Sequence, residues 1–467
     1  MKTWVFFGLI FICNVSEGQL IKEKLETAMQ QLETDPQLKH AIIGLSVLDS
    51  KADTVIYEHN AQIGLAPAST QKLFTSCAAF DLLGKTFRYT TEITYKNFNS
   101  IPSRSYFVIK PSGDPTFGSS RFDSTKASAI LKNITTALLR NKITPVSSQY
   151  IFSDSGYEKN VVPGGWIWED IGNYYGAAAQ SFNWLENQYD IFLASRSKTG
   201  GKANVVKTTP GGFLDGLQVD VSSAEKGSGD NTIVYLNYGS APASIQGSIP
   251  AGEDSFQVGA SITDPKDVFM QQLNNTMKTG KIEMFYGFDS HPPILTLPDS
   301  MFTFFNLYKH RSPSLDSINY WFLKKSINLY GEALLKTMAF QKSGFASTEK
   351  GVALLKDFWS EHDIEKSALN ICDGSGLSPQ NRVTTDALVK VLQYAKTRPW
   401  FSSFYFDLPE HNSMKMKSGS IGGARAYAGY QSSKDGTAYS FAFIINNYDG
   451  AAADVVKKMY KLLDNLK

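Results

Sequence analysis

The sequence contains few of the residues from which metal sites and disulfide frameworks are built. Its 467 residues include three cysteines and six histidines, and the histidines are dispersed over positions 40, 59, 291, 310, 362 and 411. No His-Glu-x-x-His, Cys-x-x-Cys, Gly-x-Ser-x-Gly or Gly-x-x-x-x-Gly-Lys motif occurs. These absences remove the usual signals of a zinc enzyme, a histidine-based triad and a phosphate-binding loop, so we expect neither a metal nor a cofactor.

Excess charge of one sign and long apolar runs are scarce as well. The chain has 46 Lys and Arg against 44 Asp and Glu, a net charge of +2, and its lysines are scattered. Because nucleic-acid binding needs clustered positive charge, we exclude a nucleic-acid partner. No apolar run reaches the roughly 20 residues of a transmembrane helix. With 42% hydrophobic and 19% charged residues, the composition is that of a globular protein.

The first residues have the layout of a secretory signal. A basic start at Lys2 precedes an apolar run from Trp4 to Cys13, and a small or polar stretch follows. We predict a signal peptide at residues 1–18, hence a periplasmic or secreted protein whose membrane contact is at most peripheral. A retained anchor and a lipid-modified cysteine are the alternatives. The run is short for an anchor, and the bulky Ile12 is unfavourable for lipid attachment.

Two cysteines, Cys77 and Cys372, remain after such a cleavage. An exported compartment would permit one bridge between them, but two residues make no disulfide framework. We favour two separate structural thiols and leave the pairing open.

Hydrophobic periodicity at the two ends of the chain predicts an antiparallel sheet flanked by helices. The expected elements are a helix at 20–32, strands at 41–48, 54–57, 413–417, 426–430 and 438–445, and a closing helix at 452–466. The closing helix has an apolar stripe, which favours packing on the sheet over the alternative of a membrane-surface anchor. The two chain ends together therefore form one domain.

The middle of the chain has a different pattern. From about Tyr89 to Leu297, short β-branched runs such as Gln218 to Val221 alternate with Gly, Pro and Ser turns. A chain of 467 residues is long enough for two or three cores. We predict a discontinuous domain made of residues 19–88 plus 298–467, interrupted by a β-rich insertion at 89–297 that forms one or two modules.

The first motif suited to catalysis is Ser69-Thr70-Gln71-Lys72, which precedes a helix-compatible run. Residues three apart share a helix face, so the Lys72 amine can reach the Ser69 hydroxyl. A serine is a weak nucleophile until a base takes its proton. Lys72 can be that base if burial or nearby cations lower its pKa from about 10.4. Alone, this pattern usually marks an ordinary helix start.

The second motif is Ser326-Ile327-Asn328. Residues two apart face different ways in an unbroken helix, so the Ser326 and Asn328 side chains can share one cleft only if the backbone turns there. Without that turn, the motif is a solvated polar patch.

The third motif, Lys417-Ser418-Gly419, stands at the end of an expected strand. A strand edge offers free backbone N–H groups, and glycine lets a substrate backbone approach closely. The lysine supplies positive charge for a substrate carboxylate.

The three motifs occur in the order associated with penicillin-recognising serine enzymes. With them, the chain resembles the low-molecular-mass class C penicillin-binding proteins, which are D-alanyl-D-alanine carboxypeptidases and endopeptidases, over nearly the whole mature chain. Further matching segments are Asp373 to Ser378, Gly113 to Thr116, Gly247 to Gly252, and Ala426 with Gly429 and Tyr430. The resemblance implies an α+β penicillin-binding, β-lactamase-like transpeptidase domain, with domains inserted in the 326 − 69 = 257 residues between the first two motifs.

The resemblance also implies roles for single residues. Ser69 would attack the carbonyl of the penultimate D-alanine of a peptidoglycan stem peptide, with Lys72 as the general base. Ser326 and Asn328 would line the cleft, and Ser326 would relay the proton to the leaving D-alanine. Lys417 would hold the terminal carboxylate or tune the proton network.

The backbone N–H groups of Ser69 and Ser420 would form the oxyanion hole, and Ser418 and Gly419 would belong to the strand that receives substrate. Water would then hydrolyse the acyl-enzyme, and β-lactam antibiotics would be covalent inhibitors. Asp170 and Tyr175, in the insertion, resemble residues that contact the third side chain of the stem peptide, where an acidic group would face an amino group.

Two positions depart from the family pattern. Pro379 stands where an arginine is expected after Gly-Leu-Ser, and Gly422 replaces a longer polar side chain after the lysine motif. We therefore expect altered recognition of the substrate side chain. A β-lactamase or secreted esterase, and an inactive cell-wall-binding scaffold, are the alternative functions, and the motifs do not separate carboxypeptidase from endopeptidase activity.

Overall fold

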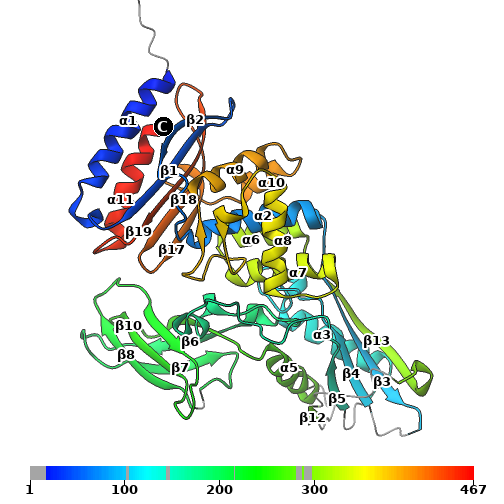
Figure 1. Cartoon of the computed structure of the whole chain (residues 1–467). Helices are drawn as coiled ribbons and strands as arrows, with labels where there is room; N and C mark the ends of the chain where they lie inside the picture. The colour runs from blue at the N-terminus through cyan, green and yellow to red at the C-terminus, as the bar shows by residue number, and fades with distance from the viewer. Residues whose placement is uncertain (1–16, 101–104, 144–147, 215, 280–286, 289–296) are drawn as a thin grey trace, which may run out of the picture.

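The structure is a computed structural model that describes residues 17–100, 105–143, 148–214, 216–279, 287–288 and 297–467 (Figure 1). Except for residues 17–18, the predicted signal peptide lies outside the described residues, and it stays a prediction. Within the described ranges, no helix combines the length and apolar character needed to span a bilayer.

Both ends of the chain contribute to one six-stranded antiparallel sheet. The strand order is β16-β17-β18-β19-β1-β2, so the first of the described strands pairs with the last. The bounds are β1 (Ile42–Asp49), β2 (Thr54–His59), β16 (Glu410–His411), β17 (Met414–Ile421), β18 (Ala424–Ser432) and β19 (Ala438–Asn446). This sheet confirms the predicted fold class.

One expectation about this sheet is wrong. The strand expected to end at Lys417 continues as β17 to Ile421, because Gly419 still pairs with Ala426 of β18. The turn follows only at Gly423, which has a φ of +68° that favours glycine. Lys417 therefore lies in the middle of a strand.

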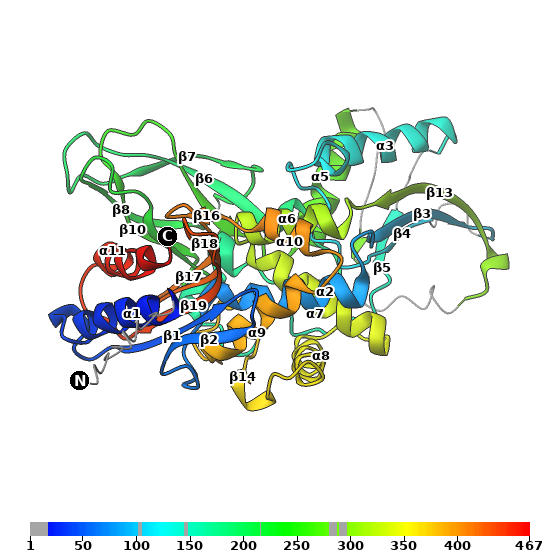
Figure 2. The same ribbon diagram turned by 90° about the horizontal axis from the view of Figure 1, so that it is seen from above.

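Two helices cover one face of the sheet. α1 (Glu17–Glu33) and α11 (Ala452–Leu463) lie side by side there (Figures 1 and 2). The buried side chains of α11 recur with helical spacing, and they share a core with α1 and the strands; they are Val455, Met459, Leu462 and Leu463. The apolar stripe of the closing helix is thus part of the core, as predicted.

A layer of helices covers the opposite face. α9 (Thr385–Lys396) packs on β1 and β19, and α2 (Lys72–Leu83) packs among the other helices. The remaining elements are α6 (Leu315–Lys324), α7 (Asn328–Ser343), α8 (Thr348–Ser360), α10 (Phe401–Asp407), β14 (Leu369–Asn370) and β15 (Arg382–Val383). The core between these helices is rich in buried aromatic rings, among them Phe74, Phe322 and Trp359, and it holds α2 against α7.

The chain between α2 and α6 forms three smaller sheets, ordered β12-β5-β4-β3-β13, β8-β10-β9 and β11-β6-β7. The strands are β3 (Thr90–Phe98), β4 (Ser105–Lys110), β5 (Ser148–Phe152), β6 (Gln188–Ala194), β7 (Asn204–Thr209), β8 (Gln218–Ala224), β9 (Asn231–Tyr235), β10 (Ser244–Pro250), β11 (Phe256–Ser261), β12 (Gly287–Phe288) and β13 (Phe302–Arg311). One continuous apolar core joins the three sheets. The β-rich character of this region is confirmed.

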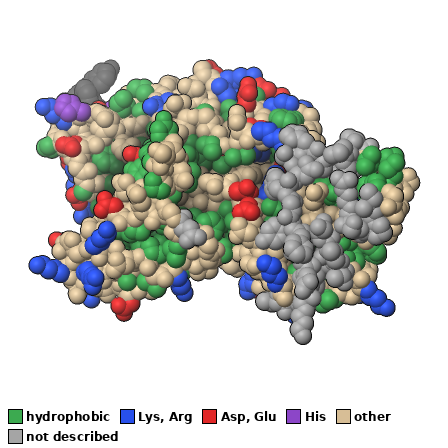
Figure 3. Space-filling model, turned by 90° about the horizontal axis from the view of Figure 1, so that it is seen from below, with side chains coloured by type: hydrophobic (Ala, Val, Ile, Leu, Met, Phe, Trp, Pro, Cys, Tyr) green, Lys and Arg blue, Asp and Glu red, His purple; other side chains and the backbone are tan. Residues whose placement is uncertain are grey.

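Helices α3 (Ala127–Arg140), α4 (Trp168–Ile171) and α5 (Pro265–Thr279) also belong to this region, and the β-branched pattern did not predict them. On the face that the region presents in Figure 3, lysine and arginine side chains are scattered singly among acidic and apolar ones.

The domain boundaries stay a prediction. β13, which the sequence assigns to the discontinuous domain, pairs along its length with β3 at the start of the insertion. We therefore propose that the insertion extends from residue 89 to Arg311.

The packing of α11 predicts a measurable difference between two of its residues. Met459 is fully buried, whereas the side chain of Lys457 is 77% exposed. Replacing Met459 by alanine should lower the free energy of unfolding by about 2 to 5 kcal/mol, because it leaves a cavity in the core. The Lys457→Ala variant should stay within about 0.5 kcal/mol of wild type. Urea denaturation measures both, and equal effects would contradict the proposed burial of the stripe.

Candidate active site

Ser69 and Lys72 lie at the start of α2, at the centre of the molecule. Ser69 belongs to a short 3₁₀ turn, Ala68–Gln71, which leads directly into the helix. The Lys72 Nζ lies 3.0 Å from the Ser69 Oγ. Ser69 is only partly buried, so its hydroxyl is reachable from outside, while Lys72 is fully buried. The helical spacing thus brings the hydroxyl and the amine together, as predicted.

The surroundings of Lys72 explain how its amine can act as a base. Its Nζ donates hydrogen bonds to the Asn328 Oδ1 at 2.6 Å and to the Ser375 backbone oxygen at 2.7 Å. Burial lowers the pKa of Lys72 to about 7, although the carboxylates of Asp373 and Glu332 oppose the shift. Near neutral pH, a large fraction of this amine therefore carries no proton.

The second motif lies at a break between two helices. α6 ends at Lys324 and α7 begins at Asn328, and Ser326 has a φ of +57°, uncommon for a residue other than glycine. This confirms the predicted turn. Both motif side chains line the same cleft as Ser69. The Asn328 Nδ2 also donates to the Tyr175 backbone oxygen at 2.7 Å.

The third motif lies on β17, beside the turn that carries Ser69. The strand β16 pairs only with the first two residues of β17, so among the described residues no strand covers the edge from Lys417 onward. A Cβ on Gly419 would lie 2.4 Å from the Pro67 backbone oxygen, so glycine is required for this close approach. An open edge of this kind can accept an extended peptide as an added strand.

Lys417 is a second buried amine in the site. Burial and the neighbouring Lys72 hold the pKa of Lys417 well below its ordinary value, and its Nζ donates to the Ser418 backbone oxygen at 2.8 Å. Two buried amines close together disfavour a charge on both.

A loop after β14 forms the wall behind Lys72, and its centre is the buried carboxylate of Asp373. The carboxylate accepts hydrogen bonds from the side chains of Gln71, Trp166 and Asn381 and from two backbone N–H groups, at 2.7 to 2.9 Å. A Cβ on Gly376 in this loop would lie 2.0 Å from the Ala68 backbone oxygen. The loop therefore fits closely against the serine turn.

Glu332, on α7, supports the same loop. Both of its carboxylate oxygens accept from the Gly374 backbone N–H at 3.1 Å. Burial, together with the nearby Asp373, raises the pKa of Glu332 to about 7. Sequence reasoning assigned no role to either carboxylate. A buried Glu on an otherwise apolar helical stretch, four residues after Asn328, is the signal that could have identified one of them.

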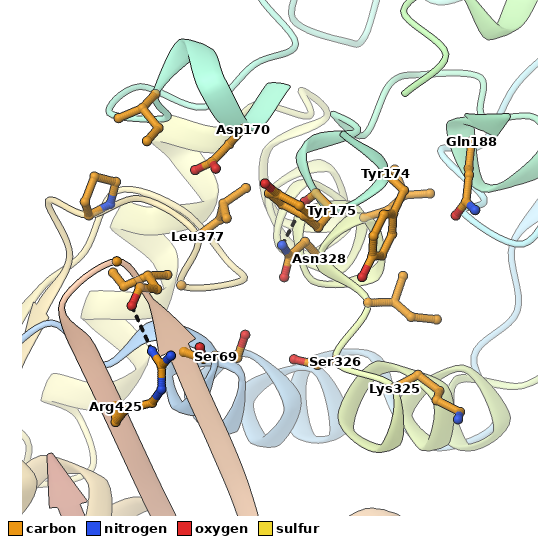
Figure 4. Close-up of a pocket in the computed structure, with 18 of the residues that line it drawn as sticks. Ser69, Asp170, Tyr174, Tyr175, Gln188, Lys325, Ser326, Asn328, Leu377 and Arg425 are labelled. Atoms are coloured by element: carbon orange, nitrogen blue, oxygen red, sulfur yellow. Dashed lines mark hydrogen bonds between the residues drawn. The ribbon is translucent and has the colours of Figure 1, made fainter. Parts of the chain in front are cut away.

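The insertion supplies the other wall of the cleft, which has a volume of about 1030 Å³. Figure 4 shows Ser69, Ser326 and Asn328 on one side, with Tyr175 facing them and Asp170 of α4 pointing into the space above Leu377. Burial and Glu169 raise the pKa of Asp170, while the Tyr175 hydroxyl opposes the shift by hydrogen bonding. Asp170 and Tyr175 thus line the same cleft as Ser69, Ser326 and Asn328.

The positions that depart from the family pattern also line this cleft. Pro379 and Gly422 both belong to its lining, and so does Arg425 of β18, whose guanidinium donates to the Ile421 backbone oxygen at 3.0 Å. The cleft therefore contains a cation at Arg425, although not at position 379, where an arginine was expected.

Several hydrogen bonds attach the insertion wall to α7. The buried Lys336 Nζ donates to the backbone oxygens of Val161 and Ala179, at 2.9 and 2.7 Å, and pairs with Glu158 at 2.9 Å. The Tyr330 hydroxyl donates to Glu186 at 2.6 Å. The cleft wall is thus fixed to the helix that carries Asn328.

In the described part of the chain, no cluster of three or more His, Cys, Asp or Glu side chains is arranged to hold a metal. Cys77 is buried and Cys372 partly buried, and neither forms a disulfide. The chemistry of the cleft comes from a reachable hydroxyl, a buried amine whose pKa is lowered to about 7, and an open strand edge. That combination suits transfer of a peptide acyl group to Ser69.

Comparisons with known proteins agree with this geometry. A model of the D-Ala-D-Ala carboxypeptidase 3 (S13) family matches residues 25–466. A D-alanyl-D-alanine carboxypeptidase of Actinomadura sp. (strain R39) is 24% identical over 462 residues, which cover 90% of this chain and 80% of the relative.

Solved structures of the same architecture exist. Penicillin binding protein 4 from Haemophilus influenzae is similar with a TM-score of 0.74 and 18% identity, covering 95% of this chain and 99% of that chain. The same Haemophilus protein complexed with a β-lactam gives a TM-score of 0.69 at the same identity and coverage.

The buried amine of Lys72 makes stability depend on pH in a specific direction. Between about pH 7 and its ordinary pKa of 10.5, Lys72 binds a proton in the unfolded chain but not in the folded one. Wild type should therefore gain stability relative to a Lys72→Met variant as pH rises, by up to about 1.4 kcal/mol per pH unit. Below pH 7 the difference should level off.

Urea denaturation at pH 6, 7, 8 and 9 measures this difference. The exposed Lys342 provides the control, since its environment is solvent in both states and Lys342→Met should run parallel to wild type. A constant offset between wild type and Lys72→Met across the range would show that Lys72 keeps its proton in the folded state.

Proposed function

This chain belongs to the D-Ala-D-Ala carboxypeptidase 3 (S13) family, and from that premise we propose that it hydrolyses peptidoglycan stem peptides through an acyl-enzyme on Ser69. The observation that carries the proposal is the 3.0 Å contact between the Ser69 Oγ and the Lys72 Nζ, whose pKa burial lowers to about 7. A nucleophile next to a base poised near the working pH is what acyl transfer requires.

In the acylation step, the Ser69 Oγ attacks the carbonyl carbon of the penultimate D-alanine, and its proton passes to the Lys72 Nζ. The hydrogen bonds from the amine to Asn328 and to the Ser375 backbone hold its orientation. The backbone N–H groups of Ser69 and Ser420 stabilise the oxyanion, where one donor is typically worth about 2.7 to 4 kcal/mol.

In the second half of the step, the C–N bond breaks and the leaving amine takes a proton. Ser326 lines the cleft beside Ser69, and we assign it the relay of this proton from Lys72 to the amine. Lys417, buried on β17, supports the substrate strand and the proton network. Water then attacks the ester carbonyl with Lys72 again as base, which releases the shortened peptide and restores Ser69.

The length of the cleft supports an endopeptidase activity beside the carboxypeptidase one. From Ser69 the lining continues past Ser326 to Lys325, Arg121 and Glu186. A single departing D-alanine does not need this space, but a D-alanine joined to a second stem peptide does. The charged and hydrogen-bonding groups along it suit a peptide leaving group.

At the other end of the cleft, Asp170 and Tyr175 receive the third side chain of the stem peptide. The carboxyl of Asp170 suits an amino group. From the same assignment we infer that the enzyme is penicillin-sensitive. It acts at the cell wall, in the periplasm or outside the cell.

Covalent labelling with a fluorescent penicillin tests the acyl-enzyme. Wild type should form a lasting adduct on the peptide that contains Ser69, while Ser69→Ala should form none, because the Ser69 hydroxyl is the one that the Lys72 amine contacts. The exposed Ser402 gives the control variant, Ser402→Ala, which should label like wild type. Mass spectrometry of the digested adduct identifies the residue.

Labelling of Ser69→Ala, or the absence of labelling of wild type, would contradict the acyl-enzyme on Ser69. Rapid turnover of penicillin would favour the β-lactamase alternative.

Digestion of purified sacculi separates the two peptidase activities. Release of D-alanine marks the carboxypeptidase, and loss of cross-linked dimers marks the endopeptidase.

The lowered pKa of Lys72 sets the pH dependence of acylation. Because the protonated amine cannot accept the serine proton, the second-order rate of penicillin acylation should rise with pH and level off above a midpoint near 7. Stopped-flow measurements from pH 5.5 to 9 test this. A rate that falls with rising pH across this range would rule out Lys72 as the base.

A further inference from the structure

An exposed aromatic cluster stands at the rim of the catalytic cleft. Trp168 is 46% exposed and Tyr238 is 77% exposed, and their ring centroids lie 6.1 Å apart. The half-buried Tyr235 supports them, with its ring 4.9 Å from that of Trp168. We call these three residues the aromatic rim. Large apolar rings left together in water usually mark a binding surface.

The aromatic rim is continuous with the cleft. Trp168 belongs to the one-turn helix α4 that carries Asp170, and both Asp170 and the preceding Ile167 line the cleft. The exposed Asp230, at the start of the segment that carries Tyr235, is close enough to contribute to the raised pKa of Tyr175 inside the cleft. A ligand in the cleft that extends outward past Asp170 therefore reaches the rim.

Hydrogen bonds and close backbone packing hold the two segments of the aromatic rim together. The buried Asn173 holds α4 to β9: its Nδ2 donates to the Glu169 backbone oxygen at 2.6 Å, and its Oδ1 accepts from the Val234 N–H at 3.0 Å. A Cβ on Gly172 would lie 2.0 Å from the Val234 backbone oxygen, so the two segments touch at the backbone. The rings are thus held in place before a ligand arrives.

The size and chemistry of the rim point to a sugar ring. Its three side chains expose on the order of 300 Å², from the 150 to 250 Å² that each aromatic side chain presents when free. A stable protein partner needs roughly 800 Å² on each side. Aromatic faces attract the weakly positive C–H groups of a pyranose. The exposed carboxylates of Glu169 and Asp230, beside the rings, can accept hydrogen bonds from hydroxyl and acetamido N–H groups.

We propose that the aromatic rim binds an N-acetylated amino sugar of the glycan strand to which the stem peptide in the cleft is attached. The inference rests on the proposed function, since it takes the peptide in the cleft to be a peptidoglycan stem. The rim then acts as a second attachment point, which raises the effective concentration of the peptide at Ser69. Substrates that keep their sugars are preferred over free peptides of the same sequence.

Two substrates with the same pentapeptide separate this role from catalysis: the free peptide and the disaccharide-linked peptide. Tyr238→Ala and Trp168→Ala should lower kcat/KM for the disaccharide substrate roughly three- to tenfold, and for the free peptide less than about twofold. Phe406→Ala removes a ring that is 66% exposed on α10, outside the cleft. This variant should leave kcat/KM unchanged for both substrates. Equal losses on both substrates, or no loss on either, would overturn the proposal.

A binding measurement keeps the proposal independent of turnover. Enzyme whose Ser69 has been blocked by penicillin is titrated with glycan strands from which the stem peptides have been removed. Wild type should bind them saturably, and Trp168→Ala should bind at least threefold more weakly. Binding that Trp168→Ala leaves unchanged would overturn the inference. Absence of D-alanine release from both pentapeptides by wild type would instead overturn the proposed function.

Discussion

The burial of a single amine is the constraint on which the rest of the active site depends. Lys72 has no contact with solvent, yet three hydrogen-bonding partners surround its Nζ: Ser69 in the turn before α2, Asn328 on α7, and Ser375 in the loop after β14. An amine in water would stay protonated and could not act as a base, whereas an amine in a purely apolar pocket would have no fixed orientation. The fold therefore brings three distant segments together around one nitrogen atom.

The insertion is part of this enclosure. Asn328 bonds Lys72 with one end of its amide and the Tyr175 backbone with the other. Trp166 donates to Asp373, at the centre of the loop behind Lys72. The insertion thus does more than widen the cleft, because its backbone and side chains complete the hydrogen bonding of groups that position the base.

The sequence predicted the parts of the site that depend on local spacing. Ser69 and Lys72 share one helical turn, and the pattern of alternating residues located the sheet. It did not predict the role of Glu332, because Glu332 supports a loop more than 40 residues later in the chain, and that contact exists only after folding. The contribution of Tyr175 through its backbone oxygen has no sequence signal either, since every residue carries that group. The end of β17 was missed because Gly419 suggests a turn, while here it is needed for close packing.

The pairing of β1 with β19 has a consequence for how the molecule comes into being. A ribosome makes the nucleophile early, but Lys417 follows 417 − 69 = 348 residues later, and β1 has only the β2 hairpin to pair with until β19 has been made. The cleft therefore lacks the strand edge of β17 during most of synthesis. Synthesis of β17, β18 and β19 supplies the remaining strands of the sheet and the third motif, so the order of synthesis itself delays assembly of the cleft.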